Sequence, residues 1–275
     1  MDSGRARRYA EAMSESPSPV RLERRGAIAV LTLDRESRRN ALSRDTLFAL
    51  GRLGRELVAD ESVRAIVLTG AGDKAFCAGA DLKERQGMST DDVRVQVGLY
   101  RTELGVLDRS PKPVIAAING VAFGGGLELA LICDLRVCAA HAELSLPETT
   151  LGIIPGAGGT QRLPRVVGEA RAKEMILLGR KLDATTALAW GLVNRVSPAG
   201  TSVLDDTLAW IEPIAHGAPI AQAAALGAIE ASYDVPLAHG LELERVFYDE
   251  TVRSEDRLEA LRAFADKRRP TFRGK

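Results

Sequence analysis

The sequence predicts an α/β fold whose strands pair mainly in parallel. Between residues 20 and 200, short apolar segments rich in β-branched residues alternate with segments of helical periodicity. Gly-rich stretches stand at several of the reversals between them. A chain of 275 residues, 45% apolar and 27% charged, has the balance of a soluble globular protein. It can bury roughly three quarters of its unfolded surface, so it needs no disulfide or metal to fold.

The first elements can be assigned in order along the chain. Residues 1–19 are polar, rich in Arg, Ser and Pro and without apolar periodicity, which predicts a disordered leader with order beginning at Val20. The apolar run 27–33 predicts a strand. Ser43 is a suitable N-cap for a helix that reaches about residue 58, and 64–69 predicts a buried strand.

The later elements continue this alternation up to residue 200 and then change in kind. Further strands are predicted at 114–118, 135–138 and 193–196, and further helices at 125–133, at 170–178 and after Asp183. Residues 203–268 predict several helices with almost no strand. We therefore expect three regions: the leader (1–19), an α/β core (20–202) and a helical C-terminal region (203–275).

Charge and residue content argue against several classes of protein. The 37 basic residues are balanced by 37 acidic ones, which argues against a nucleic-acid partner. The cysteines form neither an even framework nor a CxxC pair, which predicts free thiols in a reducing compartment: Cys77, Cys133 and Cys138. No cluster of His, Cys and carboxylates has ligand spacing, so no metal site is predicted. The longest uncharged run, 213–229, is broken by prolines and polar residues, so no membrane span is expected.

Three Gly-rich stretches are the candidates for a functional site. They are 70–82 (GAGDKAFCAGADL), 119–134 (NGVAFGGGLELALICD) and 147–162 (PETTLGIIPGAGGTQR). A single stretch of this kind commonly makes only a tight turn, but glycine also lets the backbone approach a ligand closely. In the second stretch the glycines 124–126 stand where a helix begins, so free N–H groups and the helix dipole converge there. Such N–H groups suit an oxygen that gains negative charge during a reaction.

Two acidic residues stand among apolar neighbours in these stretches. Glu128 lies in GLELALIC, within the first turn of the predicted helix, and Glu148 lies in LSLPETTLGII. A favourable interaction with the helix start would by itself explain Glu128. Burial of a carboxylate is nevertheless costly unless it has a partner or a function. The two glutamates are therefore a candidate acid/base pair.

At these residues the sequence resembles the enoyl-CoA hydratase/isomerase (crotonase) superfamily. The resemblance is carried by FCAGADLKE, NGVAFGGGLELALICDLRV and PETTLGIIPGAGGTQRLPR, and it covers about residues 20–275. It implies an α/β spiral core of ββα turns with a helical C-terminal oligomerisation region. Within the superfamily the chain is closest in character to 3-methylglutaconyl-CoA hydratases and short-chain enoyl-CoA hydratases.

The resemblance implies hydration of an α,β-unsaturated acyl-CoA thioester. By motif position, the two backbone N–H groups that hold the thioester oxygen fall on Ala80 and Gly125, and the two catalytic glutamates fall on Glu128 and Glu148. Glu148 would protonate Cα and Glu128 would orient and deprotonate water. Coenzyme A is part of the substrate, so no separate cofactor is expected.

Binding residues and assembly are also implied by the resemblance. The residues expected to contact the substrate are Ala41, Leu42, Ala78, Ala80, Asp81, Leu82, Lys83 and Gly125, with Phe247 and Lys267 approaching coenzyme A from a neighbouring subunit. A solvent-exposed charge run is the alternative explanation of Lys267. We expect a homo-oligomer, a trimer or a dimer of trimers, in the cytoplasm of a bacterium rather than in a mitochondrion.

Three alternatives remain open at this point. An isomerase of the same fold could move a double bond with one glutamate. RNA binding accompanies some methylglutaconyl-CoA hydratases through a lysine-rich helix, but the matching segment here, RLGRELVADESVR, has no Lys and balances its Arg with acids. The acyl chain is not identified either: a carboxylated chain would need a cation from Arg85, Arg94 or Arg101, and no motif selects one.

Overall fold

The computed structural model describes residues 18–275. The predicted leader falls almost wholly on residues 1–17, outside the described residues, and stays a prediction. The strands are β1 (Val20–Arg25), β2 (Ile28–Leu33), β3 (Ala65–Gly70), β4 (Ala75–Cys77), β5 (Val114–Ile118), β6 (Val121–Phe123), β7 (Leu135–Ala139), β8 (Glu143–Ser145), β9 (Leu182–Asp183) and β10 (Arg195–Ser197). The helices are η1 (Glu36–Arg38), α2 (Arg44–Ala59), α3 (Leu82–Arg85), α4 (Thr90–Asp108), α5 (Gly125–Leu131), η2 (Glu148–Leu151), α6 (Gly159–Val167), α7 (Glu169–Leu178), α8 (Ala184–Ala189), α9 (Val203–Trp210), α10 (Glu212–Ala215), α11 (Pro219–Ala231), α12 (Leu237–Val252) and α13 (Glu255–Ala265).

Two sheets are built in successive turns of the chain. The larger has the order β1-β2-β3-β5-β7-β10 and the smaller β4-β6-β8-β9. After β2, each turn of the chain consists of one strand in the large sheet, one strand in the small sheet and then one or two helices. The three turns are β3, β4, α3 and α4; β5, β6 and α5; and β7, β8, η2 and α6. All pairs in the large sheet are parallel except β1–β2, as the alternation predicts.

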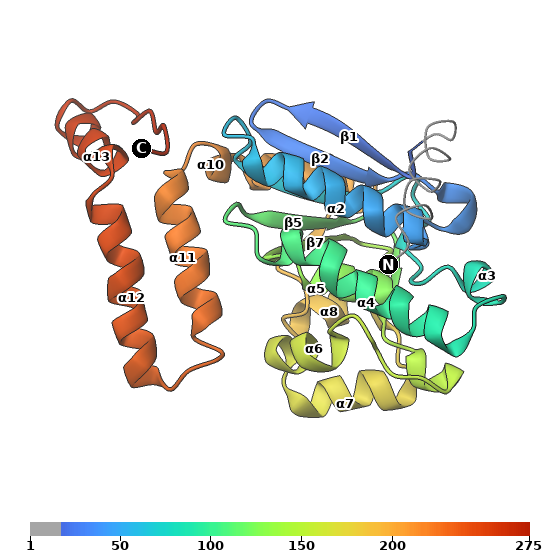
Figure 1. Cartoon of the computed structure of the whole chain (residues 1–275). Helices are drawn as coiled ribbons and strands as arrows, with labels where there is room; N and C mark the ends of the chain where they lie inside the picture. Colours follow the sequence, from blue (N-terminus) through green and yellow to red (C-terminus); the bar gives the residue numbers. More distant parts are fainter. Residues whose placement is uncertain (1–17) are drawn as a thin grey trace, which may run out of the picture.

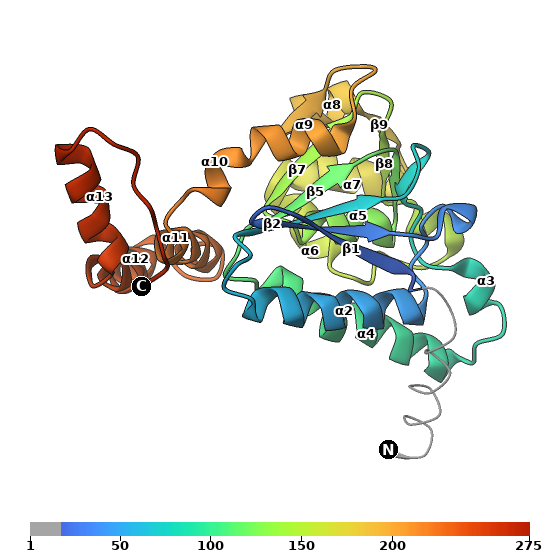
Figure 2. The same cartoon turned by 90° about the horizontal axis from the view of Figure 1, so that it is seen from above.

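The large sheet separates two apolar layers because successive side chains point to opposite faces. On β2, Leu31 and Leu33 join the main core with α2 and α4, whereas Ile28 and Val30 join a second cluster. Leu204 and Ile211, from the segment of α9 and α10, pack against that second cluster. Figure 1 shows α2 and α4 side by side, and Figure 2 shows them along one face of the sheet with α9 on the other.

Most predicted elements are observed with ends shifted by a few residues. Ser43 caps α2 by accepting the Thr46 N–H at 3.2 Å, and Asp183 caps α8 in the same way. The strand predicted at 193–196 is β10 at Arg195–Ser197, so the predicted start was two residues too early. The long helix α4 was not predicted at all.

The last three helices stand away from the sheets (Figures 1 and 2). α11 and α12 pack antiparallel to each other, and α13 folds back beside them. Because α9 and α10 still pack on the large sheet, the chain leaves the core after Ala215. The division at residue 202 stays a prediction. None of the helices within residues 18–275 is long and apolar enough to cross a membrane.

Candidate active site

The three Gly-rich stretches meet in space because each contains or directly follows one strand of the small sheet. β4, β6 and β8 are parallel neighbours, so their carboxyl ends lie along one edge. At that edge opens a cavity of about 780 Å³. Its walls come from the loop after β4, from α3 and α4, from the start of α5, and from the segment after β8: Ala78, Gly79, Ala80, Leu82, Arg85, Val93, Val97, Tyr100, Phe123, Gly124, Gly125, Glu128, Pro147, Glu148, Leu151, Ile153, Ile154, Gly156 and Ala157.

Two backbone N–H groups, those of Ala80 and Gly125, belong to residues that line this cavity. Leu42 pairs with the loop by donating its N–H to the Gly79 carbonyl at 2.8 Å and accepting the Asp81 N–H at 3.1 Å. Because alternate N–H groups of an extended segment point in opposite directions, the Ala80 N–H faces away from Leu42. Gly125 is the first residue of α5, where N–H groups have no intrahelical acceptor. A Cβ atom on Gly125 would lie 3.6 Å from the Ala80 nitrogen, so the two N–H groups are neighbours.

Glycine is required at the start of α5 for two separate reasons. Gly124 has φ +53° and ψ −127°, a conformation that residues with a Cβ atom rarely adopt. A Cβ atom on Gly126 would lie 2.0 Å from the Cys77 carbonyl oxygen, which is buried backbone that cannot move aside. The two glycines thus allow α5 to begin directly against the end of β4.

Glu128 projects from α5 into the cavity and is only 3% exposed. One carboxylate oxygen, Oε1, accepts the N–H groups of Ala157 at 2.8 Å and Gly159 at 2.7 Å. Burial raises the pKa of this carboxyl above its ordinary value, and the two N–H groups oppose that shift. The two N–H groups hold this carboxyl in a fixed orientation.

Glu148 lies at the start of η2 and is 8% exposed. Its Oε1 lies 2.9 Å from where a Cβ atom of Gly124 would stand, and its buried Oε2 has no hydrogen-bond partner within residues 18–275. Burial raises its pKa to about 7, and the charge of Glu128 adds to the shift. Near neutral pH this carboxyl is therefore divided between its acid and carboxylate forms.

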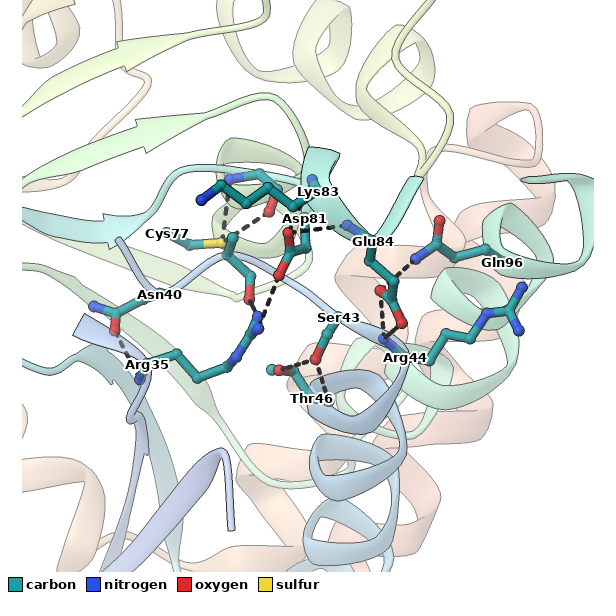
Figure 3. Close-up of polar contacts among 12 residues, drawn as sticks. Arg35, Asn40, Ser43, Arg44, Thr46, Cys77, Asp81, Lys83, Glu84 and Gln96 are labelled. Carbon is teal, nitrogen blue, oxygen red and sulfur yellow. Dashed lines mark hydrogen bonds and ion pairs between the residues drawn. The ribbon is translucent and has the colours of Figure 1, made fainter. Parts of the chain in front are cut away.

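A clamp around Arg35 holds the loop that carries Ala80 (Figure 3). The Arg35 guanidinium donates to the Ala41 carbonyl at 2.6 Å and to Asp81 Oδ2 at 2.8 Å. Asp81 Oδ1 in turn accepts the N–H groups of Lys83 and Glu84 at the start of α3. Burial raises the pKa of Asp81, but the hydrogen bonds from Arg35 and the two N–H groups outweigh it and hold this pKa below its ordinary value.

The predicted binding residues separate into four groups. Ala78, Ala80, Leu82 and Gly125 line the cavity. Ala41, Leu42 and Asp81 are buried or nearly so and hold the loop from behind, while Lys83 is exposed on α3. Phe247 on α12 and Lys267 after α13 line no part of this cavity.

Two polar residues of the cavity were missed or left undecided by the sequence. Tyr100 belongs to α4, which was not predicted, although Ser89 and Asp92 form a capping box that marks the helix start. Of the three arginines considered for an acyl-chain role, Arg85 lines the cavity, whereas Arg94 pairs with Asp91 on the surface and Arg101 lines a neighbouring hollow. Within residues 18–275 no group of three or more His, Cys, Asp or Glu side chains could hold a metal ion.

The family model described as enoyl-CoA hydratase/isomerase matches residues 23–275. The chain belongs to this family. A Bacillus subtilis enoyl-CoA hydratase/isomerase is 46% identical over 247 residues, which span 90% of this chain and 95% of that protein. The mitochondrial methylglutaconyl-CoA hydratase of Mus musculus is 42% identical over 255 residues, which span 92% and 81%.

The family assignment agrees with the three-dimensional fold. A crystal structure of an enoyl-CoA hydratase from Bacillus anthracis superposes with a TM-score of 0.91 at 44% identity, covering 94% of this chain and 100% of that one. The predicted α/β crotonase fold with a helical C-terminal region is thereby confirmed. A coenzyme A thioester is the class of substrate that the family processes.

Proposed function

We propose that this enoyl-CoA hydratase/isomerase family member is a hydratase that adds water across the α,β double bond of an enoyl-CoA thioester. The observation that carries the proposal is the pairing of two buried carboxyls, Glu128 and Glu148, in one cavity beside the adjacent N–H groups of Ala80 and Gly125. Addition of water needs a proton acceptor, a proton donor and a site for a negative oxygen, and these four groups supply all three.

In the proposed reaction the thioester carbonyl oxygen accepts the N–H groups of Ala80 and Gly125. Negative charge grows on this oxygen as water attacks Cβ, and the positive end of the α5 dipole favours it. Loss of one such donor typically slows a reaction about 10²–10³-fold. No cofactor is needed in this scheme, because the thioester itself accepts the electron pair.

The two carboxyls divide the proton transfers in the same scheme. Glu128, fixed by two N–H groups, takes the proton from the attacking water, whose oxygen bonds to Cβ. Glu148, with a pKa of about 7, delivers its proton to Cα and so quenches the enolate. Solvent then returns Glu128 to its carboxylate form and Glu148 to its acid form, which completes the cycle.

The test is to replace each carboxyl by its amide. We expect Glu128→Gln and Glu148→Gln each to lower the rate of crotonyl-CoA hydration by roughly 10²–10⁴-fold, with thioester binding retained. Glu143→Gln, on the exposed side of β8, is the matched control and keeps its rate. Near-normal turnover in either cavity variant would contradict the two-carboxyl mechanism.

Two narrower possibilities are tested with the same enzyme. A double-bond isomerase would convert 3-hexenoyl-CoA to the 2-enoyl isomer and would tolerate loss of one carboxyl. Because relatives named methylglutaconyl-CoA hydratase are 42% identical, 3-methylglutaconyl-CoA belongs in the substrate panel beside crotonyl-, tiglyl-, 3-methylcrotonyl- and longer enoyl-CoA thioesters. The ranking of kcat/KM across this panel identifies the acyl chain.

We also propose that the chain works as a homo-oligomer, a trimer or a dimer of trimers, in the cytoplasm. What supports assembly is a set of large apolar side chains left exposed on α11–α13, from 39% for Val252 to 78% for Leu237 and 86% for Phe264. In such an assembly Phe247 and Lys267 would reach the coenzyme A of a neighbouring subunit. Native mass measurement tests this proposal, and a fully active monomer would contradict it.

A further inference from the structure

The turn that orients Glu128 is tied to the rest of the fold by an ion pair between two helices. The Arg162 guanidinium on α6 donates to Asp108 Oδ2 at 2.7 Å, and Asp108 is the last residue of α4. Both side chains are partly buried, at 31% and 25% exposed. Neither residue lines the cavity of the proposed reaction, so the proposed chemistry gives this pair no task.

The Arg162 guanidinium lies directly against the turn at residues 157–159. A Cβ atom on Gly158 would stand 1.9 Å from Arg162 Nη1, so the guanidinium occupies the space into which a side chain would project. The same nitrogen donates a weak hydrogen bond to the Ala157 carbonyl at 3.5 Å. Gly158 has φ +107°, which glycine adopts readily, and its carbonyl accepts the Arg162 N–H at 2.9 Å. Arg162 thus contacts the turn through both its backbone and its side chain.

This turn supplies both of the donors that hold Glu128. The N–H groups of Ala157 and Gly159, one on each side of Gly158, reach Glu128 Oε1 at 2.8 Å and 2.7 Å. Any movement of the turn relative to α5 therefore moves both donors at once. Because a misplacement of about 1 Å can lower a rate by about 10²-fold, the contacts that fix this turn bear directly on a base at Glu128.

Arg162 also acts on Glu128 through its charge. Burial raises the pKa of Glu128, and the opposing effects come from the two N–H groups, then from Arg162 and then from Arg85 on α3. The remaining titratable groups of the elements around this carboxyl are Cys77 on β4, Tyr100 on α4 and Glu148 on η2. Burial raises the pKa of the thiol to about 12 and also raises the pKa of the phenol, so both are neutral at neutral pH. Arg162 is thus the cation with the larger effect on the Glu128 carboxyl.

We propose that Arg162 is a positioning residue for the base Glu128 and that Asp108 anchors Arg162 in this task. This inference rests on the proposed hydratase activity and adds to it the residues that set the orientation of the base. Arg162 lies outside the cavity, so it acts on the reaction only through the turn and through its charge. The path of contacts runs from the end of α4 through the guanidinium and the turn to Glu128 Oε1.

The competing explanation is that the ion pair only joins α4 to α6 and so stabilises the fold. A purely stabilising pair would lower the thermal unfolding midpoint of its variants without changing kcat at temperatures where they are fully folded. A positioning pair lowers kcat in the folded variant and leaves KM nearly unchanged, because the contacts with the thioester remain. It also moves the acid limb of kcat/KM to higher pH, because the carboxylate form of Glu128 loses a nearby cation and its ordered donors.

The experiment measures crotonyl-CoA hydration across a pH series in folded variants. We expect Arg162→Gln to lower kcat by about 10- to 100-fold, with KM changed by less than about threefold and the acid limb at higher pH. Arg162→Lys keeps the charge without the planar fork, so it should keep the acid limb and recover only part of kcat. Asp108→Asn releases the guanidinium but keeps its charge, and it should lower kcat by roughly 3- to 10-fold. Arg165→Gln, on the exposed side of α6, is the matched control and should change neither kcat nor the acid limb.

A double-mutant cycle separates the possible failures. In a Glu128→Gln background the base is gone, so Arg162→Gln should lower the remaining rate by less than about twofold. An equal loss in both backgrounds, or an unchanged kcat in folded Arg162→Gln, would overturn the positioning role while leaving hydration intact. Near-normal turnover in Glu128→Gln alone would instead refute the proposed function and this inference with it. If Arg162→Gln does not fold, Asp108→Asn takes its place in the cycle, and an unchanged kcat there would overturn the anchor.

Discussion

The Arg35 clamp offers a direct test of how the fold positions the oxygen-binding N–H groups. Arg35 and Asp81 form an ion pair at 2.8 Å whose side chains are 22% and 9% exposed. Arg35→Gln leaves the Asp81 carboxylate without its cation and the Ala41 carbonyl without its donor. Removing one partner of a buried pair costs about 3–5 kcal/mol, and partial exposure reduces this here to roughly 2–4 kcal/mol.

We expect this loss to appear in both stability and turnover. At about 2–3 °C per kcal/mol for a chain of this size, the thermal unfolding midpoint should fall by roughly 5–10 °C at fixed protein concentration. Release of the loop also displaces the Ala80 N–H, so kcat on crotonyl-CoA should fall by up to about 10²–10³-fold. KM should change far less, because most contacts with the thioester remain.

A matched control and a pH series make the reasoning refutable. Arg52→Gln breaks an exposed pair with Glu56 on α2 and should cost at most about 1 kcal/mol with no change in kcat. Since the pKa of Asp81 is lowered in the folded chain, its stabilisation is complete above the unfolded value near 3.9 and is lost as pH falls through the folded value. The stability gap between wild type and Arg35→Gln should therefore narrow in acid. A stable variant with unchanged kcat would refute the clamp.

Three further outcomes are expected. Because Glu148 acts as the acid and its pKa lies near 7, kcat/KM should fall as pH rises above about 7, and Glu148→Gln should abolish this dependence in a stopped-flow pH series. Gly126→Ala places a methyl group against a backbone carbonyl, so it should lower the free energy of unfolding by at least about 1–3 kcal/mol and remove most of the activity. Its control, Gly98→Ala, lies in an open part of α4 and should raise the free energy of unfolding by about 0.5–1 kcal/mol, as measured by thermal unfolding. Burial raises the pKa of the thiols, so a thiol reagent should label the native protein slowly and the unfolded chain fully at Cys77, Cys133 and Cys138.

The large sheet could be predicted from the sequence because its strands are buried on both faces. β2, β3 and β5 are therefore nearly continuous apolar runs that stand out from their surroundings. α4 could not be predicted in this way. Its segment DVRVQV alternates apolar and polar residues, which is the pattern of a strand. The segment is nevertheless helical because it packs beside α2 in the fold. Because Tyr100 lies on α4, it was not predicted as a cavity residue either.

Local motifs located the candidate site, but its supporting contacts depend on distant pairs. Ala80, Gly125, Glu128 and Glu148 all lie in Gly-rich segments that follow the three small parallel strands, so they could be found one stretch at a time. Arg35 is 46 residues from Asp81 in the chain, and no periodicity connects them. The roles of the four residues remain predictions for the variants above to test.

The different tasks proposed for the two glutamates also arise from tertiary contacts. In sequence, Glu128 and Glu148 look alike, each a single acid among apolar residues. In the fold, the turn that begins α6 directs the N–H groups of Ala157 and Gly159 at one of them, which favours its carboxylate form. Within residues 18–275 no group donates to Glu148 Oε2, and burial outweighs the opposing effects of a backbone N–H and the Arg85 charge on this carboxyl, which favours the acid form. If this difference sets their roles, a change that removes the Gly159 N–H, such as Gly159→Pro, should raise the pKa of Glu128 and shift the acid limb of kcat/KM to higher pH. An unshifted acid limb in a folded Gly159→Pro variant would show that these N–H groups do not select the base.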